Sequence, residues 1–137
     1  KIEINEKSDI LGFGWTHNLS GKGAWSEGYF SNLLFEVKKT ENINIQIECE
    51  PFINEKIKNL NLKVLVNGNL IEEIKFKFDK DNSNKIKLMN ITVNKNLIKN
   101  NKINLQFINE NAKSPLDILQ SPDSRKIGFL IKNISLI

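Results

Sequence analysis

The segment Leu60-Asn61-Leu62-Lys63-Val64-Leu65-Val66 is followed at once by Asn67-Gly68. Apolar side chains recur at every second position from 60 to 66, which is the pattern of a strand with one buried face. Asn-Gly is the strongest short-range signal for a two-residue hairpin turn, because both residues tolerate a positive φ. Residues 70–78 then alternate again, with Ile74, Phe76 and Phe78 on one face. The segment therefore predicts a β-hairpin over residues 60–78.

The same two-residue period extends over most of the chain. It recurs in five further segments, at residues 29–37, 43–47, 86–93, 103–107 and 127–137. Only residues 114–119 predict a helix, a short one that Ser114 caps and that has Pro115 in its first turn. Strands at this spacing predict an all-β fold: a two-sheet antiparallel β-sandwich, jelly-roll or Ig-like, with about seven or eight strands.

The length of 137 residues suits one β-sandwich domain covering residues 1–137, without linker or repeat. Because the chain begins at Lys1 rather than Met, we expect it to be a fragment of a longer protein. No apolar run approaches the roughly 20 residues of a membrane-spanning helix. We therefore expect no membrane insertion.

Charge and rare residues exclude several classes of function. The net charge is +4, but 19 of the 20 basic residues are lysines scattered among acidic residues, unlike the basic stripe of a nucleic-acid-binding protein. His17 is the only histidine and Cys49 the only cysteine, which rules out an intrachain disulfide and a His-pair metal site. The strand parity of Cys49 predicts a buried structural thiol. We expect no nucleic-acid partner, no metal and no cofactor.

Two segments, residues 12–28 and 114–125, break the strand alternation. The first contains both tryptophans and five of the seven glycines, and the second contains two of the three prolines and the only arginine, Arg125. Long irregular loops in a compact domain are either functional or disordered. The two tryptophans and the arginine argue against disorder, so these loops are the candidate functional region.

These segments also carry short motifs in a fixed order. They are Gly14-Trp15, Trp25-Ser26-Glu27-Gly28, Asn67-Gly68, Ser114-Pro115 and Asp123-Ser124-Arg125-Lys126-Ile127-Gly128. In this order they resemble a carbohydrate-binding-module-like β-sandwich, an accessory domain of bacterial surface-glycan proteins that occurs beside glycosyltransferases. The sequence departs from the pattern in one respect, because residues 16–24 lack the acidic residue usual between the two tryptophans.

The resemblance implies a carbohydrate context and a binding or positioning role, and it supplies no catalytic residues. It leaves the compartment open between the bacterial cytoplasm, where glycans are assembled, and the cell surface.

Trp15 and Trp25 are the leading candidates for ligand binding. Indole rings in loops above a rigid sheet stack on the C–H faces of sugars. Four polar neighbours would supply hydrogen bonds to sugar hydroxyls: His17, Asn18, Ser26 and Glu27. The alternative is that one or both rings close the open end of the sandwich as part of the core.

Arg125 and Asp123 form a second candidate site. The planar guanidinium could hold the carboxylate or phosphate of an acidic glycan. The alternative is a structural ion pair of Arg125 with Asp123, Asp117 or Glu27, which would clamp the two irregular loops together.

Two further readings of the carboxylates are less well supported. Asp79, Asp81 and Asn82 suggest a calcium loop, but the alternating oxygen ligands, the central Gly and the closing Glu of such a loop are missing, which favours a solvated turn. Glu27 and Asp123 could in principle cleave a glycoside, but nothing positions them as a pair. No Gly-x-Ser-x-Gly elbow or phosphate loop is present, so we predict that the domain is not an enzyme.

The sequence favours a non-catalytic, lectin-like carbohydrate-binding module that acts on bacterial surface glycans through an aromatic loop platform. Its partners would be a glycan or sugar and other domains of the parent protein. The alternative is a structural or interaction domain that packs against a neighbouring glycosyltransferase or mediates oligomerisation.

Overall fold

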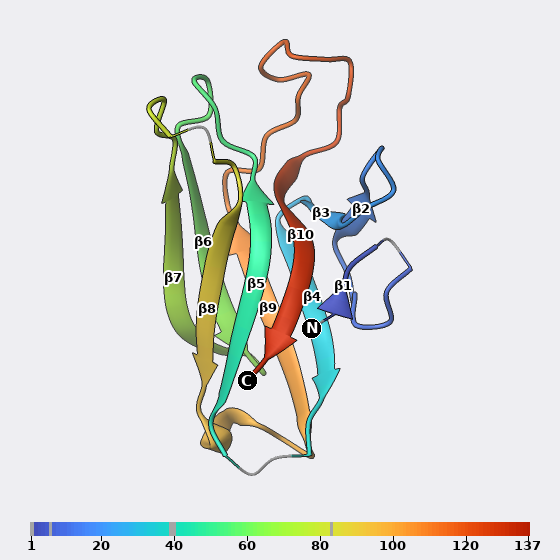
Figure 1. The fold of residues 1–137 in the computed structure, drawn as a ribbon, viewed down its shortest axis with the longest axis vertical. Helices are drawn as coiled ribbons and strands as arrows, with labels where there is room; N and C mark the ends of the chain where they lie inside the picture. The colour runs from blue at the N-terminus through green and yellow to red at the C-terminus, as the bar shows by residue number, and fades with distance from the viewer. Residues whose placement is uncertain (1, 6, 39–40, 83) are drawn as a thin grey trace.

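The computed structural model describes residues 2–5, 7–38, 41–82 and 84–137, which form two antiparallel β-sheets packed face to face (Figure 1). The first sheet has the order β2-β3-β10-β5-β8, with β1 also paired to β10. The second sheet has the order β4-β9-β6-β7. The first sheet consists of β1 (Ile2–Glu3), β2 (Trp15–His17), β3 (Ala24–Glu27), β5 (Ile43–Pro51), β8 (Lys87–Val93) and β10 (Ile127–Leu136). The second consists of β4 (Phe30–Glu36), β6 (Asn59–Val66), β7 (Asn69–Lys77) and β9 (Lys102–Asn109).

The all-β sandwich is confirmed, and the expected strand count is too low. The described residues contain ten strands rather than seven or eight. The strands that the sequence did not resolve are β1, β2 and β3, which have two, three and four residues. Segments this short cannot display an alternating pattern, so their strand conformation comes from pairing with β10 and with each other.

The hairpin expected at residues 60–78 is confirmed as β6 and β7. Asn67 has φ 49° and Gly68 has φ 85°, the pair of positive values that a type I′ turn requires. The Asn67 side chain also donates to the Leu97 carbonyl at 2.6 Å and accepts from the Asn104 N–H at 2.9 Å. Every other connection between consecutive strands from β4 to β10 crosses from one sheet to the other, so no second Asn-Gly turn is needed.

The short helix expected at residues 114–119 does not form, and these residues make consecutive turns instead. Its capping contact is present: the Ser114 N–H donates to Asp117 Oδ2 at 2.9 Å, and the Asp117 N–H donates to Ser114 Oγ at 3.0 Å. No helix follows because six residues are too few to offset the cost of nucleation, and Leu119 already has φ 59°. The described residues contain one short 3-10 helix, Lys95–Leu97.

The core lies between the two sheets and is built by the predicted alternation. Ile45, Ile47 and Ile131 face it from the first sheet, and Leu62 and Leu105 from the second; each is fully buried. The rings of Phe107 and Phe129 meet edge to face across the sandwich, with centroids 5.2 Å apart. Burial of each such side chain contributes about 1.5–3 kcal/mol to the stability of the fold. The two sheets are therefore a stable support for the loops at the ends of the sandwich.

One side of the sandwich is closed by the first irregular segment. Leu11 pairs with Leu33 of β4 in the second sheet, and Trp15 then pairs with Ser26 of β3 in the first. The chain between them therefore bridges the two sheets beside β4 and β3. This bridge sets the position of both tryptophans.

Candidate functional site

The two tryptophans lie on opposite faces of the β2–β3 ribbon. Trp15 is paired with Ser26, and Thr16 is paired with Trp25. Directly opposed residues share a face and neighbouring residues alternate, so Trp15 points the same way as the buried Ser26 while Trp25 points outward with Thr16. The structure does not bring the two indole rings together as one platform.

Trp15 is partly buried and packs against the core. Its ring contacts Phe129 edge to face, with centroids 5.8 Å apart and planes at 87°. Its indole N–H donates to the Asn32 carbonyl at 2.8 Å, so the polar end of the ring is satisfied inside the protein. These contacts match the alternative in which Trp15 closes the side of the sandwich.

Trp25 lies on the outer face of the first sheet. Trp25 pairs with Leu130 of β10, and Leu130 pairs on its other side with Glu50 of β5. The Trp25 ring meets the Phe52 ring edge to face, with centroids 6.1 Å apart and planes at 81°. The ring is half-buried, between its buried neighbours Ala24 and Ser26. Trp25 and Phe52 both line the larger of the two pockets described below, and Trp25 is the predicted member of this pair.

The remaining polar candidates of the first loop have different surroundings. Ser26 is buried and its Oγ accepts the N–H of Phe129 at 3.0 Å, which is a structural contact. The Asn18 amide donates to Ser20 Oγ and to the Lys22 carbonyl within its own turn. His17 and Glu27 are exposed. His17 lies beside Trp15 in a small pocket, whereas Trp25 lines a different and larger one.

Arg125 forms the structural clamp that was one of the two sequence alternatives, and this alternative is confirmed. Its guanidinium holds Asp123 through three hydrogen bonds of 2.7–3.1 Å. Its Nη1 donates to Thr16 Oγ1 at 3.2 Å and to the His17 carbonyl at 2.6 Å. The contact joins the second irregular segment to β2, and it uses the fork that an acidic ligand would need.

The clamp also perturbs the titration of both partners. Hydrogen bonds from Arg125 lower the pKa of the Asp123 carboxyl to about 2, and the hydrogen bond to Asp123 raises the pKa of Arg125. In the neighbouring turn, Lys126 Nζ contacts Asp117 Oδ2. That contact, together with the Ser114 hydrogen bonds, lowers the pKa of Asp117 to about 2.

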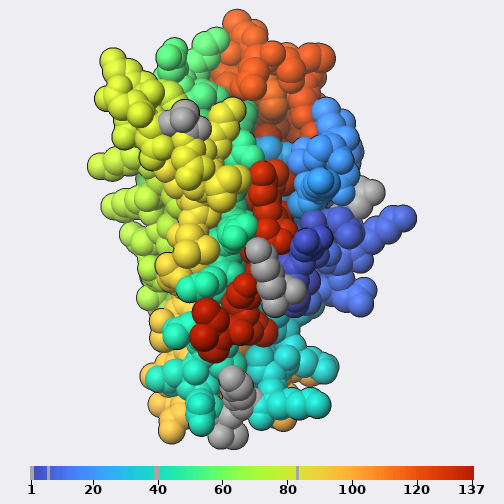
Figure 2. Space-filling view, viewed as in Figure 1, coloured from blue at the N-terminus to red at the C-terminus, as the bar shows by residue number. Residues whose placement is uncertain are grey.

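An open groove of about 710 Å³ lies at the end of the sandwich where β5 and β7 finish and β8 begins. Three loops meet there, with described residues 52–58, 78–82 together with 84–86, and 114–122; Figure 2 shows them in green, yellow and orange at one end of the molecule. Its apolar wall consists of Trp25, Pro51, Phe52, Ile53, Phe78 and Ile118. The polar lining consists of Glu50, Asn54, Glu55, Lys56, Lys77, Asp79, Lys80, Asn82, Asn84, Lys85, Lys87 and Gln120.

Of these lining residues only Trp25 was a sequence candidate. Phe52 and Lys87 were missed because they stand at the end and the start of separate strands, 35 positions apart in the numbering. Residues 79–82 were interpreted as a solvated turn, and Asp79 Oδ1 does accept the backbone N–H of Asp81 at 2.9 Å. The one available signal was the pair Pro51-Phe52, which places an aromatic residue just past a strand end.

Cys49 and possible metal ligands do not add to the site. Cys49 is fully buried, as predicted, and burial raises the pKa of its thiol to about 12, which leaves it unreactive near neutral pH. Across the described ranges no three His, Cys, Asp or Glu side chains converge as metal ligands. In the same part of the chain, no helix has the length and apolar character to cross a membrane.

The sequence pattern identifies the family. Residues 11–121 match the family described as "Cellulose synthase BcsB, first CBM domain", where CBM denotes carbohydrate-binding module. The chain belongs to this family. The matched range contains both tryptophans and most of the groove-forming loops, and membership confirms the carbohydrate-binding-module resemblance. A comparison with curated proteins finds no match.

Solved carbohydrate-binding modules share the fold. A family 35 module from an environmental isolate superposes with a TM-score of 0.53 and 13% identity, over 99% of this chain and 81% of the other. The module CBM36 in complex with calcium and xylotriose gives 0.56 and 6% identity, over 100% of both chains. At these identities the likeness concerns the fold alone, and of the two sandwich types expected it supports the jelly-roll.

Proposed function

We propose that this chain is a non-catalytic carbohydrate-binding module that holds a glycan in the groove beside Trp25 and Phe52. The observation that carries the proposal is the position of Trp25, a half-buried indole on the outer face of a rigid sheet at the edge of a groove of about 710 Å³. A groove of this size lies within the range of small-molecule sites, about 300–1,000 Å³. Family membership supports a sugar as the occupant.

The chemistry of the lining suits a sugar ring. Trp25 and Phe52 offer apolar faces for the C–H groups of a pyranose, and the edge-to-face contact between them fixes their orientation. Asn82, Asn84 and Gln120 stand among the lining residues, and their amides provide the directional hydrogen bonds that hydroxyl groups require. The groove thus combines one apolar wall with a polar rim.

The biological setting we propose is one module within a longer protein that handles a bacterial polysaccharide beside a glycosyltransferase. The family name refers to cellulose synthase, and a module of the same fold was solved with xylotriose. Cello-oligosaccharides and xylo-oligosaccharides are therefore the first ligands to test. Lys80, Lys85 and Lys87 lie among the groove residues together with Asp79, and their positive charges disfavour a metal cation there. We therefore expect that EDTA, which removes divalent cations, leaves oligosaccharide binding unchanged.

The two tryptophans provide a matched test of this function. Trp25→Ala should weaken oligosaccharide binding by about tenfold or more while leaving the melting temperature nearly unchanged. Trp15→Ala removes a core ring and should cost about 3 kcal/mol of stability, with binding retained in the molecules that stay folded. Titration calorimetry and thermal unfolding of both variants measure the two effects.

Two results would count against the proposal. Binding that is intact in Trp25→Ala but lost in folded Trp15→Ala would move the site to the small pocket of Lys7, Trp15, Thr16 and His17, which has a volume of about 370 Å³. If the chain without substitutions binds none of these oligosaccharides, the sugar-binding function is rejected.

A second candidate is an interaction domain of a larger assembly. It is favoured by the large apolar side chains that the irregular segments leave in solvent, since Phe13 is 79% exposed, Leu19 85% and Leu119 84%. Replacing these three by Ser should abolish self-association if the domain oligomerises through them. Light scattering of the parent chain that shows a monomer at all concentrations would reject the oligomeric form of this function.

A further inference from the structure

The groove beside Trp25 carries an excess of positive charge. Its charged lining residues are five lysines, Lys56, Lys77, Lys80, Lys85 and Lys87, and three carboxylates, Glu50, Glu55 and Asp79. The rest of the chain mixes the two signs more evenly, since 15 of the 20 basic residues and 13 of the 16 acidic residues lie outside the groove. The excess is therefore concentrated at the site that we propose for the glycan.

Two of these groups are already used by contacts inside the protein. The Glu50 carboxylate lies 3.6 Å from the Lys132 ammonium group, so its charge is balanced from outside the groove. Lys56 Nζ donates to the Ile118 carbonyl at 2.7 Å and ties the loop of residues 52–58 to that of residues 114–122. Within the described ranges, the other four lysines make no ion pair.

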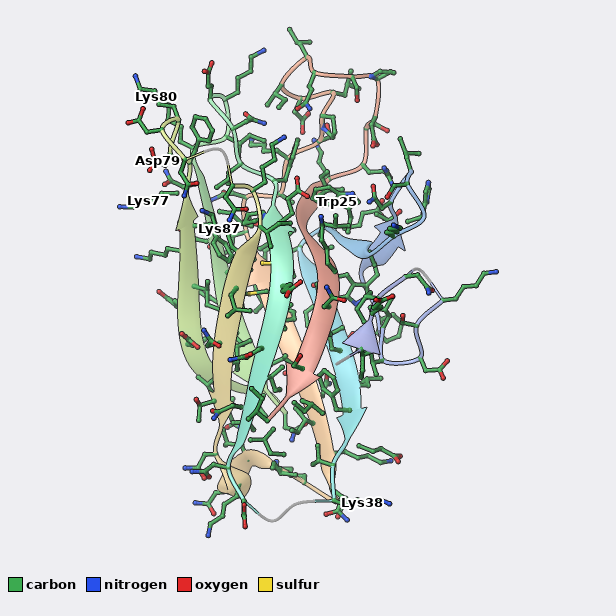
Figure 3. All side chains as sticks on the ribbon, in the orientation of Figure 1. Trp25, Lys38, Lys77, Asp79, Lys80 and Lys87 are labelled. Carbon is green, nitrogen blue, oxygen red and sulfur yellow. The ribbon has the colours of Figure 1, made fainter. Side chains whose placement is uncertain are left out.

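The fold explains why these four lysines gather at one place. Lys77 is the last residue of β7 and Lys87 the first residue of β8, and Lys80 and Lys85 lie on the loop between them. Strands β7 and β8 are edge strands of opposite sheets, so this loop crosses the open end of the sandwich. Figure 3 shows Lys77, Lys80 and Lys87 on the β7–β8 side of the half of the molecule that also contains Trp25, with Lys38 at the opposite end.

The polar side chains of the same loop add donors rather than acceptors. The Asn82 side-chain oxygen accepts the N–H of Asn84 at 3.0 Å, and the Asn84 oxygen accepts the N–H of Ile86 at 3.0 Å. The side-chain NH2 groups of both asparagines and the lysine ammonium groups are the donors among the residues that line the groove. A donor-rich site is complementary to a ligand that is rich in acceptors, and charge-assisted hydrogen bonds to anionic oxygens are the strongest of these contacts.

Resting on the proposed function, we propose that the groove selects an anionic glycan, a chain whose sugars carry carboxylate groups. Trp25 and Phe52 bind the apolar face of a sugar ring, and the lysines at the end of β7, on the following loop and at the start of β8 bind its carboxylates. We assign the carboxylates to these lysines rather than to Arg125, because the Arg125 guanidinium already holds Asp123.

A chemically matched pair of probes tests this selectivity. Cellotetraose and cellotetraose oxidised at C6 share one backbone and differ at C6, where a carboxylate replaces the neutral CH2OH group. We expect the oxidised form to bind about tenfold more tightly at about 0.05 M salt, and this advantage to shrink to about twofold or less at about 0.5 M, where exposed charges are screened. Titration calorimetry on the full chain measures both affinities, and a phosphorylated cello-oligosaccharide tests whether the site requires a carboxylate.

Lysine variants locate the effect in the groove. The double variant Lys77→Gln/Lys87→Gln should lose most of the advantage of the oxidised probe, so that the ratio of the two affinities falls toward one. Lys38→Gln removes the same charge at the far end of the molecule and should leave both affinities unchanged. The melting temperature of each variant shows whether its fold is intact.

The outcomes separate this inference from the proposed function. Equal or tighter binding of neutral cellotetraose, with binding lost in Trp25→Ala, overturns the anionic selectivity and leaves the glycan-binding function standing. An advantage that Lys38→Gln removes as much as Lys77→Gln/Lys87→Gln overturns the assignment to the groove. Binding of neither probe, nor of any other oligosaccharide, overturns both.

Discussion

Most residues of the short motifs in this chain are explained by packing inside the protein. A Cβ on Gly128 would lie 2.5 Å from the Asn109 amide nitrogen and 2.8 Å from Ser26 Oγ. Ser26 Oγ in turn accepts the buried N–H of Phe129. Trp15 donates to the Asn32 carbonyl. These motif residues therefore hold the first loop against β10 and β4. Trp25 is the motif residue whose ring lines the groove.

Gly14 shows how tight this packing is. Its φ is +80°, and a Cβ would lie 1.9 Å from the carbonyl oxygen of Phe30. Gly14→Ala should therefore cost at least about 2 kcal/mol of unfolding free energy, from strain in the backbone and from displacement of β4. Urea unfolding followed by tryptophan fluorescence measures the loss.

Gly21→Ala is the control for backbone strain alone, because Gly21 has φ +78° and nothing within 4 Å of its Cβ position. It should cost only about 1 kcal/mol. Equal losses in the two variants would show that the close approach of Gly14 to Phe30 has no energetic consequence.

Among the elements, the short ribbon of β2 and β3 depends on contacts beyond its own hydrogen bonds. A ribbon of three and four residues is marginal by itself. Strand β10 pairs with β3 on one side, and Arg125 holds β2 through Thr16 and the His17 carbonyl on the other. The clamp therefore keeps the face of Trp25 in a fixed position.

The clamp should make the stability of the protein sensitive to acid. The pKa of Asp123 is lowered to about 2 from its ordinary value of 3.8, so the folded state binds this proton less readily than the unfolded state. Its stabilising contribution is complete above about pH 4 and is lost as the pH falls through about 2. Asp123→Asn should flatten the decline in unfolding free energy over this range, measured by urea titration at a series of pH values.

Asp117→Asn is the matched control, since the pKa of Asp117 is also lowered to about 2, by Lys126 and Ser114, outside the clamp. This variant should also flatten the decline in unfolding free energy at acid pH. It should leave unchanged the hydrogen exchange of the Gly28 N–H, which donates to the Lys126 carbonyl at 2.7 Å next to the clamp. Faster exchange there in Asp117→Asn and not in Asp123→Asn would contradict the assignment of the clamp.

At the scale of the whole molecule, the last strand in the sequence is the centre of the first sheet. Strand β10 pairs with β1, β3 and β5. Ile127, Phe129, Leu130, Ile131 and Ile134 of this strand are all buried. The sandwich cannot close until the C-terminal residues are in place.

Truncation after Lys126 should therefore abolish cooperative unfolding. Five buried apolar side chains at about 1.5–3 kcal/mol each exceed or match the whole stability of a typical domain, about 5–15 kcal/mol. Circular dichroism and thermal melts measure the loss. Removal of Ile137 alone, which is 60% exposed and contributes a backbone hydrogen-bond pair to Asn44, should cost less than about 2 kcal/mol. A cooperative melt in the longer truncation would contradict the central role of β10.

The sequence by itself determined the sandwich, because the alternation of apolar and polar residues along a strand and the residue types of a turn are local properties. Alternation predicted the long strands, Asn67-Gly68 predicted the one hairpin among them, and the parity of Cys49 predicted its burial. The motifs also pointed to a carbohydrate-binding-module-like domain, which is the part of the resemblance that the family match confirms. The short strands β1 to β3 were not predicted, because they are too short to show a periodicity and form only by pairing with β10 and with each other.

The tertiary structure alone decided which side chains share a surface. One residue of register sends Trp15 into the core and Trp25 outward, and a register is fixed by pairing partners that lie far apart in the sequence. The groove joins Trp25 to Phe52 and Lys87 through three loops that meet only after both sheets have closed. Local sequence carries no record of that meeting, because the distances between loops are set by the packing of the whole core.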